Sequence, residues 1–421
     1  MGHQLSLKGI WVWLICTFFF LYEFFLRTVL GSYQSILMKD FDMSAVQFSF
    51  LSSTVFLLVC AFMQIPAGLI TNRLGLKKSL FLATGCCAIS TILFSFAEQY
   101  WEAVCLRMLM GLGASFGFMP LLVAIYEWLP VRYGAFFIGL SQFIGTMGPM
   151  LAGGPMEGLV HHSEVGWRYV FFHVGLVGLV ISLLVLLFVC NNIQTAGRYV
   201  ISYKPIPIKQ SLGKLFLRSQ PWFVAILSGC LYFTVEYLTE NEGRSYLIMR
   251  GFSPLSAGYT LTLSWVGYAL GCPLLGFLSD YFERRVVFFR LCALIYLTAI
   301  LMLLYVPGIY PAQAALVLLG LSAAGQTIGF AIMSEQFQVP YRVVGFGLNN
   351  TFMTLMSAVN APLIGWLLQQ FRLSFSEWDA YFIAFHLFMG IACLIVLLAF
   401  FMIRETYCKS QVAMTFVKVQ Q

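Results

Sequence analysis

The sequence predicts an all-α integral membrane protein, with twelve transmembrane helices in two pseudo-symmetric six-helix bundles. Composition, recurring apolar runs and an internal repeat lead to this prediction. The 421-residue chain is 60% hydrophobic and 10% charged, whereas a soluble protein carries about 25% charged residues. Runs of about 20 apolar residues recur, and each can cross about 30 Å of hydrocarbon as a helix. Barrel strands are shorter and alternate in polarity, so the runs favour helices.

Polar breaks divide the apolar runs into successive spans. The first follows Lys8 without a small-residue cleavage site, so we expect a retained signal anchor. In order, the twelve expected spans are 10–31, 47–70, 79–97, 102–126, 135–158, 167–190, 221–242, 255–278, 286–305, 312–333, 344–368 and 379–403. The longest break contains PIPIKQ and is the expected linker. The predicted domains are an N-terminal bundle (1–190), a cytoplasmic linker (191–220), a C-terminal bundle (221–403) and a cytoplasmic tail (404–421).

Charge is distributed unevenly between the two sets of connections. If the N-terminus is cytoplasmic, most of the 24 cations fall on that side, among them Lys77, Lys78, Arg284 and Arg285. Acidic residues collect in the opposite loops. Cationic loops stay in the cytoplasm, so we expect both termini inside, in a plasma (cell inner) membrane. The net charge of +7 therefore indicates membrane orientation, and no nucleic-acid partner is expected.

The eleven cysteines are scattered, mostly within spans, and lack metal-ligand spacing. Small buried apolar residues are the simplest interpretation. No nucleophile–base set, HExxH metal site or GxxxxGK[ST] phosphate loop is present, which argues against an enzyme or an ATP-driven pump. We expect no metal and no cofactor, and the expected partners are lipid, protons and a small-molecule substrate bound by a monomer.

The second half of the chain repeats the first. Gly68 and Gly276 stand 208 positions apart, so that GLITNRLGLKK lies over GFLSDYFERRV. The same offset aligns YEWLPVRYGAFFIGL with SEQFQVPYRVVGFGL, and Glu127 with Glu335. An even number of helices in each half gives both copies one orientation, a recurring plan among transporters.

The stretch PAGLITNRLGLKK resembles the loop between helices 2 and 3 of the major facilitator superfamily, Gly-x-Leu-x-Asp-Arg-x-Gly-x-Lys/Arg-Lys/Arg. The chain has Asn72 where that family has Asp, and the second copy has Tyr281 where the Arg would stand. Arg107 in RMLMGLGASFG fits the Arg-x-x-x-Gly of helix 4. GTMGPMLAGGP, from Gly145 to Pro155, is similar to the glycine-proline motif of helix 5, although its glycine spacing differs. The resemblance covers essentially the whole chain.

The resemblance implies that the loop belongs to a latch that stabilises the outward-facing state. The expected latch residues are Gly68, Asn72, Arg73, Gly75, Lys77, Arg107, Glu127, Asp280, Arg284 and Glu335. Asn72 lacks the charge of the usual Asp, so the latch is expected to be weaker in this half. We expect Glu127 to pair with Arg73 or Arg132, and Glu335 with Arg284 or Arg342. Direct contact with substrate or protons is the alternative role for both acids.

Ionisable groups inside spans are costly and are therefore candidates for function. In helix 1, FFLYEFFLRTVLGSY places Tyr22, Glu23 and Arg27 in the span. Glu23 and Arg27 are four residues apart on one helical face and can neutralise each other. Alternatively, Arg27 binds a substrate carboxylate with its guanidinium fork, and Glu23 orients it or exchanges a proton.

Helix 7 reads LYFTVEYLTENEG and repeats a polar residue every fourth position: Tyr232, Glu236 and Glu240. The resemblance implies that helices 1 and 7 line a central cavity. Glu236 is the first candidate for proton coupling, with Glu23 the second; contact with water at the outer mouth is the alternative for Glu236. Glu240 is expected to be an exposed residue of the mouth.

Polar and aromatic residues of other helices complete the predicted substrate path. They are Gln142, Trp265, Tyr268 and Gln326, with weaker candidates that include Gln64, Asn349, Asn350 and Asn360. Such side chains also join helices to one another. Arg107 is either structural or a second anion contact.

Three functional classes are consistent with these features. A secondary active carrier using alternating access is preferred over a membrane-embedded enzyme and over a sensor that binds without moving solute. The helix 1 arginine with LSS and QIPAGL in helix 2 is similar to the organic anion:proton symporter branch and to bacterial phagosomal nutrient transporters. We expect proton-coupled uptake of a small carboxylate-bearing metabolite: an organic anion, an amino acid or a carboxylate siderophore. The alternative is an antiporter that exports a siderophore or an amphipathic compound.

Overall fold

The computed structural model describes residues 6–129, 134–162, 166–190, 218–337 and 342–409, and the regular structure in these ranges is helical. In the first half, α1 (Leu7–Thr28), α5 (Leu76–Phe94) and α10 (Trp167–Phe188) are single helices, and α6–α7 (Tyr100–Ala114, Phe118–Trp128) form one expected span with a break at 115–117. The remaining elements are η1 (Val29–Tyr33), α2 (Gln34–Asp40), α3 (Ala45–Ser49), η2 (Phe50–Thr54), α4 (Val55–Leu74), α8 (Gly134–Ala152), α9 (Gly154–His162), α13 (Ser219–Glu240), α14 (Gly243–Met249), α15 (Pro254–Tyr281), α16 (Val286–Tyr305), α17 (Ile309–Ala323), α18 (Gln326–Gln336), α19 (Arg342–Phe371), α20 (Glu377–Leu397) and η5 (Leu398–Met402).

The expected spans are confirmed as helices. Within the described residues, eleven helical stretches are long and apolar enough to cross a membrane. The remaining expected span, 135–158, corresponds to α8 and α9, which are separated by a break at Gly153. With this pair included, the chain has the predicted twelve-helix architecture.

By contacts, the chain divides into two compact units. Unit 1 comprises the described residues of Met1–Ser202, Tyr237–Thr262 and Ala358–Gln369. Unit 2 comprises those of Tyr203–Glu236, Leu263–Ser357 and Gln370–Gln421. Unit 1 therefore takes segments from both halves of the sequence, whereas the described residues of unit 2 all come from the second half. The predicted domain boundaries, at residues 190 and 221, separate the two copies of the sequence repeat and not these compact units. They stay a prediction.

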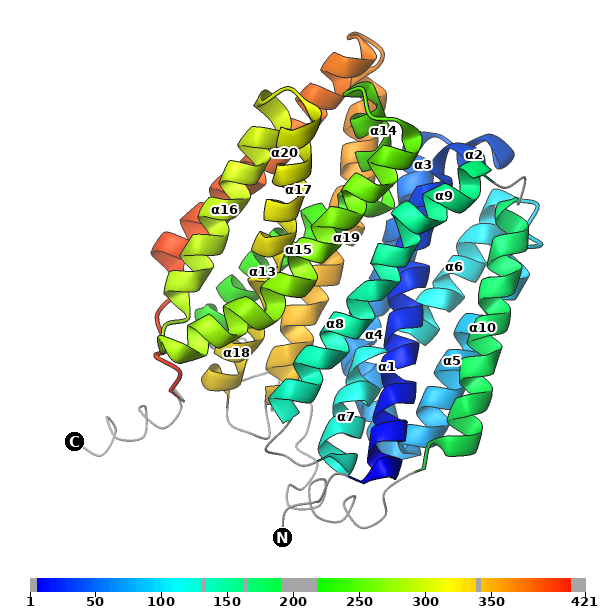
Figure 1. Ribbon diagram of the computed structural model, residues 1–421, viewed down its shortest axis with the longest axis vertical. Coiled ribbons are helices and arrows are strands. Elements are labelled where there is room, and N and C mark those ends of the chain that lie inside the picture. The colour runs from blue at the N-terminus through cyan, green and yellow to red at the C-terminus, as the bar shows by residue number, and fades with distance from the viewer. Residues whose placement is uncertain (1–5, 130–133, 163–165, 191–217, 338–341, 410–421) are drawn as a thin grey trace. The chain divides into compact units, whose positions relative to one another are not determined.

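In unit 1 the strongest packing joins α5 with α10, α1 with α8, and α5 with α6 (Figure 1). Local signals set the helix starts. Ser6 caps α1 by accepting a bond from the Gly9 amide, and Ser44 opens α3 with a capping box. Gly75 ends α4 with φ of 79°, a backbone conformation that glycine adopts without steric cost. Gly75 therefore provides the tight turn between α4 and α5.

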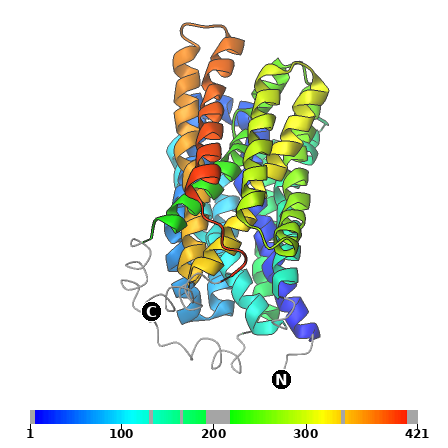
Figure 2. The same ribbon diagram turned by 90° about the vertical axis from the view of Figure 1, so that its left-hand side faces the viewer.

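In unit 2 the strongest packing joins α16 with α17 and α16 with α20. Figure 2 shows α16 and α17, in yellow-green and yellow, running side by side. Ser376 caps α20 by accepting a bond from the Asp379 amide. The buried faces of α16 and α17 are lined by small and aliphatic residues such as Ala293, Ala315 and Leu319, which permit close approach of the helix axes.

Two spans contain a π-helical turn, and an arginine from another helix binds each. In unit 1, η2 presents the Ser52 carbonyl, which accepts a 2.9 Å bond from Arg107 Nη2. In unit 2, Arg290 donates 3.2 Å bonds to the carbonyls of Ala399 and Phe400 in η5. Such turns weaken the regular bonding of a helix, and carbonyls in a membrane interior need a donor from the protein. Arg290 was not singled out in the sequence.

Candidate functional site

Arg27 lies in the last turn of α1 and is only 9% exposed. Its Nε stands 3.9 Å from Oε1 of Glu240, and its guanidinium lies over the Phe24 ring at 5.6 Å. The second oxygen of Glu240 accepts a 2.8 Å bond from the Ser53 hydroxyl. The 3.9 Å separation is an ion pair without a close hydrogen bond, so another carboxylate that approached Arg27 could replace Glu240.

Further polar contacts extend from this pair, and all belong to unit 1. Asn241 donates to the Ser53 hydroxyl at 2.8 Å and accepts from the Ser52 hydroxyl at 2.6 Å. We call the set Arg27, Ser52, Ser53, Glu240 and Asn241 the Arg27 cluster. Glu240 was expected to be exposed at a mouth, and this is wrong: it is 1% exposed, because Arg27 and Ser53 cover its carboxylate. In the sequence, Ser52 and Ser53 were noted only as part of the LSS stretch of helix 2 that is similar to the organic anion:proton symporter branch.

Positions related by the sequence repeat touch one another beside the Arg27 cluster. Gln34 donates a 2.8 Å bond to Glu242, and these residues are 208 positions apart. Gly31 and Thr239 have the same offset, and a Cβ on Gly31 would overlap the Thr239 carbonyl oxygen. Both contacts join the segment that follows α1 to the end of α13 and the residues just after it.

Tyr22 and Glu23 of α1 contact other helices of unit 1. The Tyr22 ring lies against Gly178 of α10, among the helices of unit 1. Glu23 is 6% exposed and lies at the break between α6 and α7, where a Cβ on Gly117 would stand 2.8 Å from its Cγ. The carboxylate thus lies near the N-terminus of α7, where the helix dipole favours negative charge. Gln142 of α8 is half-buried.

Arg107 is fully buried and binds backbone. Its Nη1 donates to the Leu26 carbonyl at 2.7 Å, and its Nη2 donates to the carbonyls of Arg27 and Ser52 at 3.0 and 2.9 Å. The guanidinium also lies over the Phe56 ring at 4.3 Å. Arg107 therefore joins the end of α1 to η2, which favours its structural role over the anion contact.

Four predicted substrate residues gather within unit 2. Tyr232, Trp265 and Tyr268 form an edge-to-face cluster with centroid distances of 5.7 to 6.1 Å. Gln326 donates a 2.6 Å bond to the Tyr268 hydroxyl, and all four are 1% exposed. Glu236, one turn beyond Tyr232 on α13, is completely buried. The sequence analysis named all four members of this cluster, and their role in binding a substrate stays a prediction.

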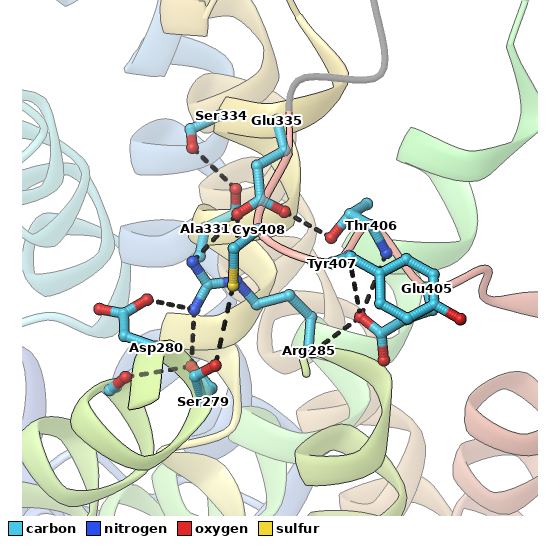
Figure 3. Close-up of polar contacts among 11 residues, drawn as sticks. Ser279, Asp280, Arg285, Ala331, Ser334, Glu335, Glu405, Thr406, Tyr407 and Cys408 are labelled. Atoms are coloured by element: carbon cyan, nitrogen blue, oxygen red, sulfur yellow. Dashed lines mark hydrogen bonds and ion pairs between the residues drawn. The ribbon is translucent and has the colours of Figure 1, made fainter. Parts of the chain in front are cut away.

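The second copy of the loop motif forms an ion-pair network around Arg285 (Figure 3). The guanidinium contacts Glu335 Oε1 at 3.0 Å and Asp280 Oδ1 at 2.6 Å. Burial lowers the pKa of Arg285, but the carboxylates of Glu335 and Asp280 outweigh this effect and leave the pKa above its usual range. The Arg285 side chain therefore stays charged throughout the accessible pH range.

The segment after α20 fastens onto the same network. Glu405 accepts bonds from the amides of Arg285 and Val286, at 2.8 and 2.9 Å, and so caps the N-terminus of α16. Thr406 donates a 2.5 Å bond to Glu335 Oε2. Residues 404–409 of the predicted tail are thus held by side-chain contacts. The sequence analysis missed Glu405 and Thr406, because neither residue lies in the aligned motifs of the sequence repeat.

The expected partner of Glu335 is corrected by these contacts. Arg284 does not pair with it: its guanidinium lies over the Tyr407 ring at 4.8 Å, and the next residue, Arg285, makes the pair. The side chain of the other expected partner, Arg342, lies outside the described part of the chain. In the first copy Lys77 is half-buried. The surroundings of Gly68, Asn72, Arg73 and Glu127 fall outside the description too, so their latch roles stay predictions.

Replacing Glu335 with glutamine is expected to destabilise the protein, because Arg285 then keeps a buried charge without this ion-pair partner. Loss of one partner from a buried pair costs about 3–5 kcal/mol. Thermal unfolding of the full chain in detergent measures the change. Glu377→Gln is the matched control, since Glu377 is 66% exposed in its pair with Arg372 and such pairs contribute little. Unchanged stability combined with lost uptake would instead support direct substrate contact.

The helices and the buried charged sites together define a multi-pass membrane transport protein. The sequence profile of the Major Facilitator Superfamily matches residues 13–241 and 245–412. The chain belongs to this family, and it is a transporter and not an enzyme.

Several characterised or inferred transporters are similar to the chain. A probable sulfoacetate transporter of Cupriavidus necator is 26% identical over 335 residues, covering 74% of this chain and 76% of that protein. A probable galactarate/D-glucarate transporter of Escherichia coli is 26% identical over 257 residues, covering 53% and 55%. Among solved structures, a D-xylose–proton symporter superposes with a TM-score of 0.74 at 18% identity, covering 95% of this chain and 99% of the other. At this identity, the similarity to the symporter shows a shared fold.

Proposed function

We propose that the chain is a proton-coupled carrier that takes up small carboxylate-bearing metabolites by alternating access. The observation that carries this proposal is Arg27, a buried guanidinium within an expected span, held in a loose ion pair with Glu240 at 3.9 Å. Buried charges inside spans mark substrate pathways, and a guanidinium matches a carboxylate with two parallel bonds. The similar transporters named for sulfoacetate and for galactarate or D-glucarate handle organic acids, which supports the same class.

In this proposal Arg27 alternates between two partners. A substrate carboxylate competes with Glu240 for the guanidinium. When the substrate leaves, Glu240 binds Arg27 and Ser53 again. The contacts of Asn241 and Gln34 then join η2 and α2 to the segment after α13. From the cation distribution, we place this end on the outer side of a plasma membrane, with both termini in the cytoplasm. Re-formation of the Arg27 cluster would then favour release of substrate to the inside.

The proton sites in the proposal are Glu236 first and Glu23 second. Glu236 is completely buried, and Glu23 is 6% exposed. A carboxylic acid within a span can cross between states neutral and release its proton where water reaches it. Glu23 lies four residues before Arg27 on α1, so protonation of Glu23 would change the charge balance along this helix.

Uptake by proteoliposomes with an imposed inward proton gradient tests the function. We expect concentrative uptake of radiolabelled carboxylates that collapses when a protonophore is added. Glu236→Gln is expected to abolish gradient-driven accumulation while keeping exchange of internal for external substrate, because exchange needs no net proton movement. Glu98→Gln is the control, an acid in the loop preceding α6. Equal gradient-driven accumulation in the wild-type, Glu236→Gln and Glu23→Gln proteins would remove both acids from the proton role.

Export of an amphipathic compound in exchange for protons is a second candidate. A quinolone resistance transporter of Acinetobacter baumannii is 26% identical over 140 residues, which cover 31% of each chain. The glycines of the helix 5 motif pack α8 closely onto α1, where Gly148 lies against Leu21 and Phe25. Quinolone efflux by vesicles, with no uptake of any carboxylate, would favour this alternative.

A further inference from the structure

Within unit 2, two uncharged polar side chains lie against one small residue, Gly329 of α18, and a third lies one turn earlier on the same helix. A Cβ on Gly329 would overlap the Ser228 hydroxyl of α13, and would stand 3.2 and 3.4 Å from Oδ1 and Nδ2 of Asn349 on α19. Gln326 lies one turn earlier on α18 and donates to Tyr268 of the aromatic cluster. We call Ser228, Gln326 and Asn349 the Gly329 polar cluster. Glycine at 329 leaves the space in which the three helices bring these groups together.

The polar atoms of this cluster are buried without protein partners. Ser228 and Asn349 are 0% exposed and Gln326 is 1% exposed. Within the described residues, the Ser228 hydroxyl, both amide atoms of Asn349 and Oε1 of Gln326 make no hydrogen bond. Proteins rarely leave such groups unsatisfied, and exceptions call for an explanation such as a bound molecule. Three such side chains on neighbouring helices indicate a site in which a ligand supplies the missing hydrogen bonds.

The available donors and acceptors define what that ligand offers. Asn349 supplies two N–H donors and one acceptor, and Ser228 can donate or accept. Gln326 presents its carbonyl oxygen, since its amide group donates to Tyr268. A carboxylate only accepts and would face that oxygen unfavourably, whereas a hydroxyl group both donates and accepts. The cluster is therefore complementary to hydroxyl groups, and the three side chains carry no charge.

We propose that Ser228, Gln326 and Asn349 form a subsite for the hydroxyl groups of the substrate, so that the chain prefers polyhydroxylated carboxylates over the corresponding deoxy acids. The inference rests on the proposed uptake of carboxylates and adds the chemistry of the rest of the substrate. A site that hydrogen-bonds a substrate hydroxyl strongly rejects the analogue without it, because its buried polar groups are then left unpaired. Water alone in the cluster would give no such preference.

Matched pairs of acids test the subsite with the full chain in proteoliposomes under a proton gradient. The pairs are adipate and its 2,3,4,5-tetrahydroxy derivative, succinate and its dihydroxy derivative tartrate, and propionate and its dihydroxy derivative glycerate. We expect uptake of at least one hydroxylated acid to exceed that of its partner by about 10-fold or more. Asn349→Leu is expected to bring this ratio close to one by reducing uptake of the hydroxylated acid alone.

Controls separate the subsite from a structural role and from the proposed function. Ser357→Ala removes another buried hydroxyl of α19 that makes no hydrogen bond within the described residues, and it should leave the ratio unaltered. Asn349→Leu should not lower the thermal unfolding temperature, since it removes groups that have no partner. If acids enter but no pair shows a preference, or if Asn349→Leu keeps the preference, the subsite is disproved and carboxylate uptake stands. If no acid of any pair enters, the proposed function and the subsite both fail.

Discussion

Arg27→Ala is expected to abolish measurable uptake of carboxylates. Truncating one partner of a buried charged contact costs about 2–5 kcal/mol, so substrate affinity should fall by about 100-fold or more, at tenfold for each 1.4 kcal/mol. Binding to the purified full chain and uptake by proteoliposomes measure the loss. Arg27→Lys should recover only part of it, because an ammonium keeps the charge but lacks the guanidinium fork.

Two further variants distinguish substrate binding from closure of the Arg27 cluster. Arg27→Ala also leaves Glu240 without this cation, so the variant should be less stable as well as inactive. Adding Glu240→Gln removes the uncompensated acid and should restore stability without restoring affinity. Arg168→Ala, at a half-exposed arginine paired with Asp40, controls for a general effect of losing an arginine. If the Arg27→Ala variant keeps its affinity for an acidic substrate, the proposed binding of the substrate carboxylate by Arg27 is contradicted.

Arg107→Met is expected to be the most destabilising single change in unit 1. The substitution removes the hydrogen bonds that Arg107 donates to the carbonyls of Leu26, Arg27 and Ser52. Each buried polar group left unsatisfied costs about 1–3 kcal/mol, so the free energy of unfolding should fall by at least about 3 kcal/mol. The thermal unfolding temperature in detergent measures this effect.

Two comparisons make the Arg107 test specific. Arg107→Lys should have an intermediate effect, since an ammonium has three donors but cannot span the separated carbonyls as the planar fork does. Arg290→Met removes two longer bonds, both 3.2 Å, at a less buried position and should cost less. An Arg107→Met protein of normal stability that fails to bind anionic substrates would support the anion contact instead.

The sequence predicted the helices well because apolar run length is a local property. It predicted all twelve spans, and it selected Tyr232, Trp265, Tyr268 and Gln326, which the structure brings together. It also identified Arg285 and Glu335 as equivalent to Lys77 and Glu127 through the repeat offset. Periodicity and duplication are both visible in a single chain, so no tertiary information was needed for these predictions.

The errors concern contacts between segments far apart in the chain. Glu240 was placed at an exposed mouth because it lies near the end of a span, yet Ser53, 187 positions away, bonds it and helps to bury it. Glu335 was assigned to Arg284 or Arg342, whereas Arg285, the neighbour of Arg284 in the turn before α16, makes the pair. Neither burial by a distant helix nor the direction of a side chain at a turn can be determined from spacing.

The composition of unit 1 has a consequence for how this polypeptide can be divided. Segments Tyr237–Thr262 and Ala358–Gln369 come from the second half of the sequence but pack with the first. Severing the chain in the 191–220 interval would therefore leave an N-terminal fragment that lacks two segments of unit 1. This fragment expressed alone should be prone to degradation, and complementation should require that the C-terminal fragment be made with it in one membrane.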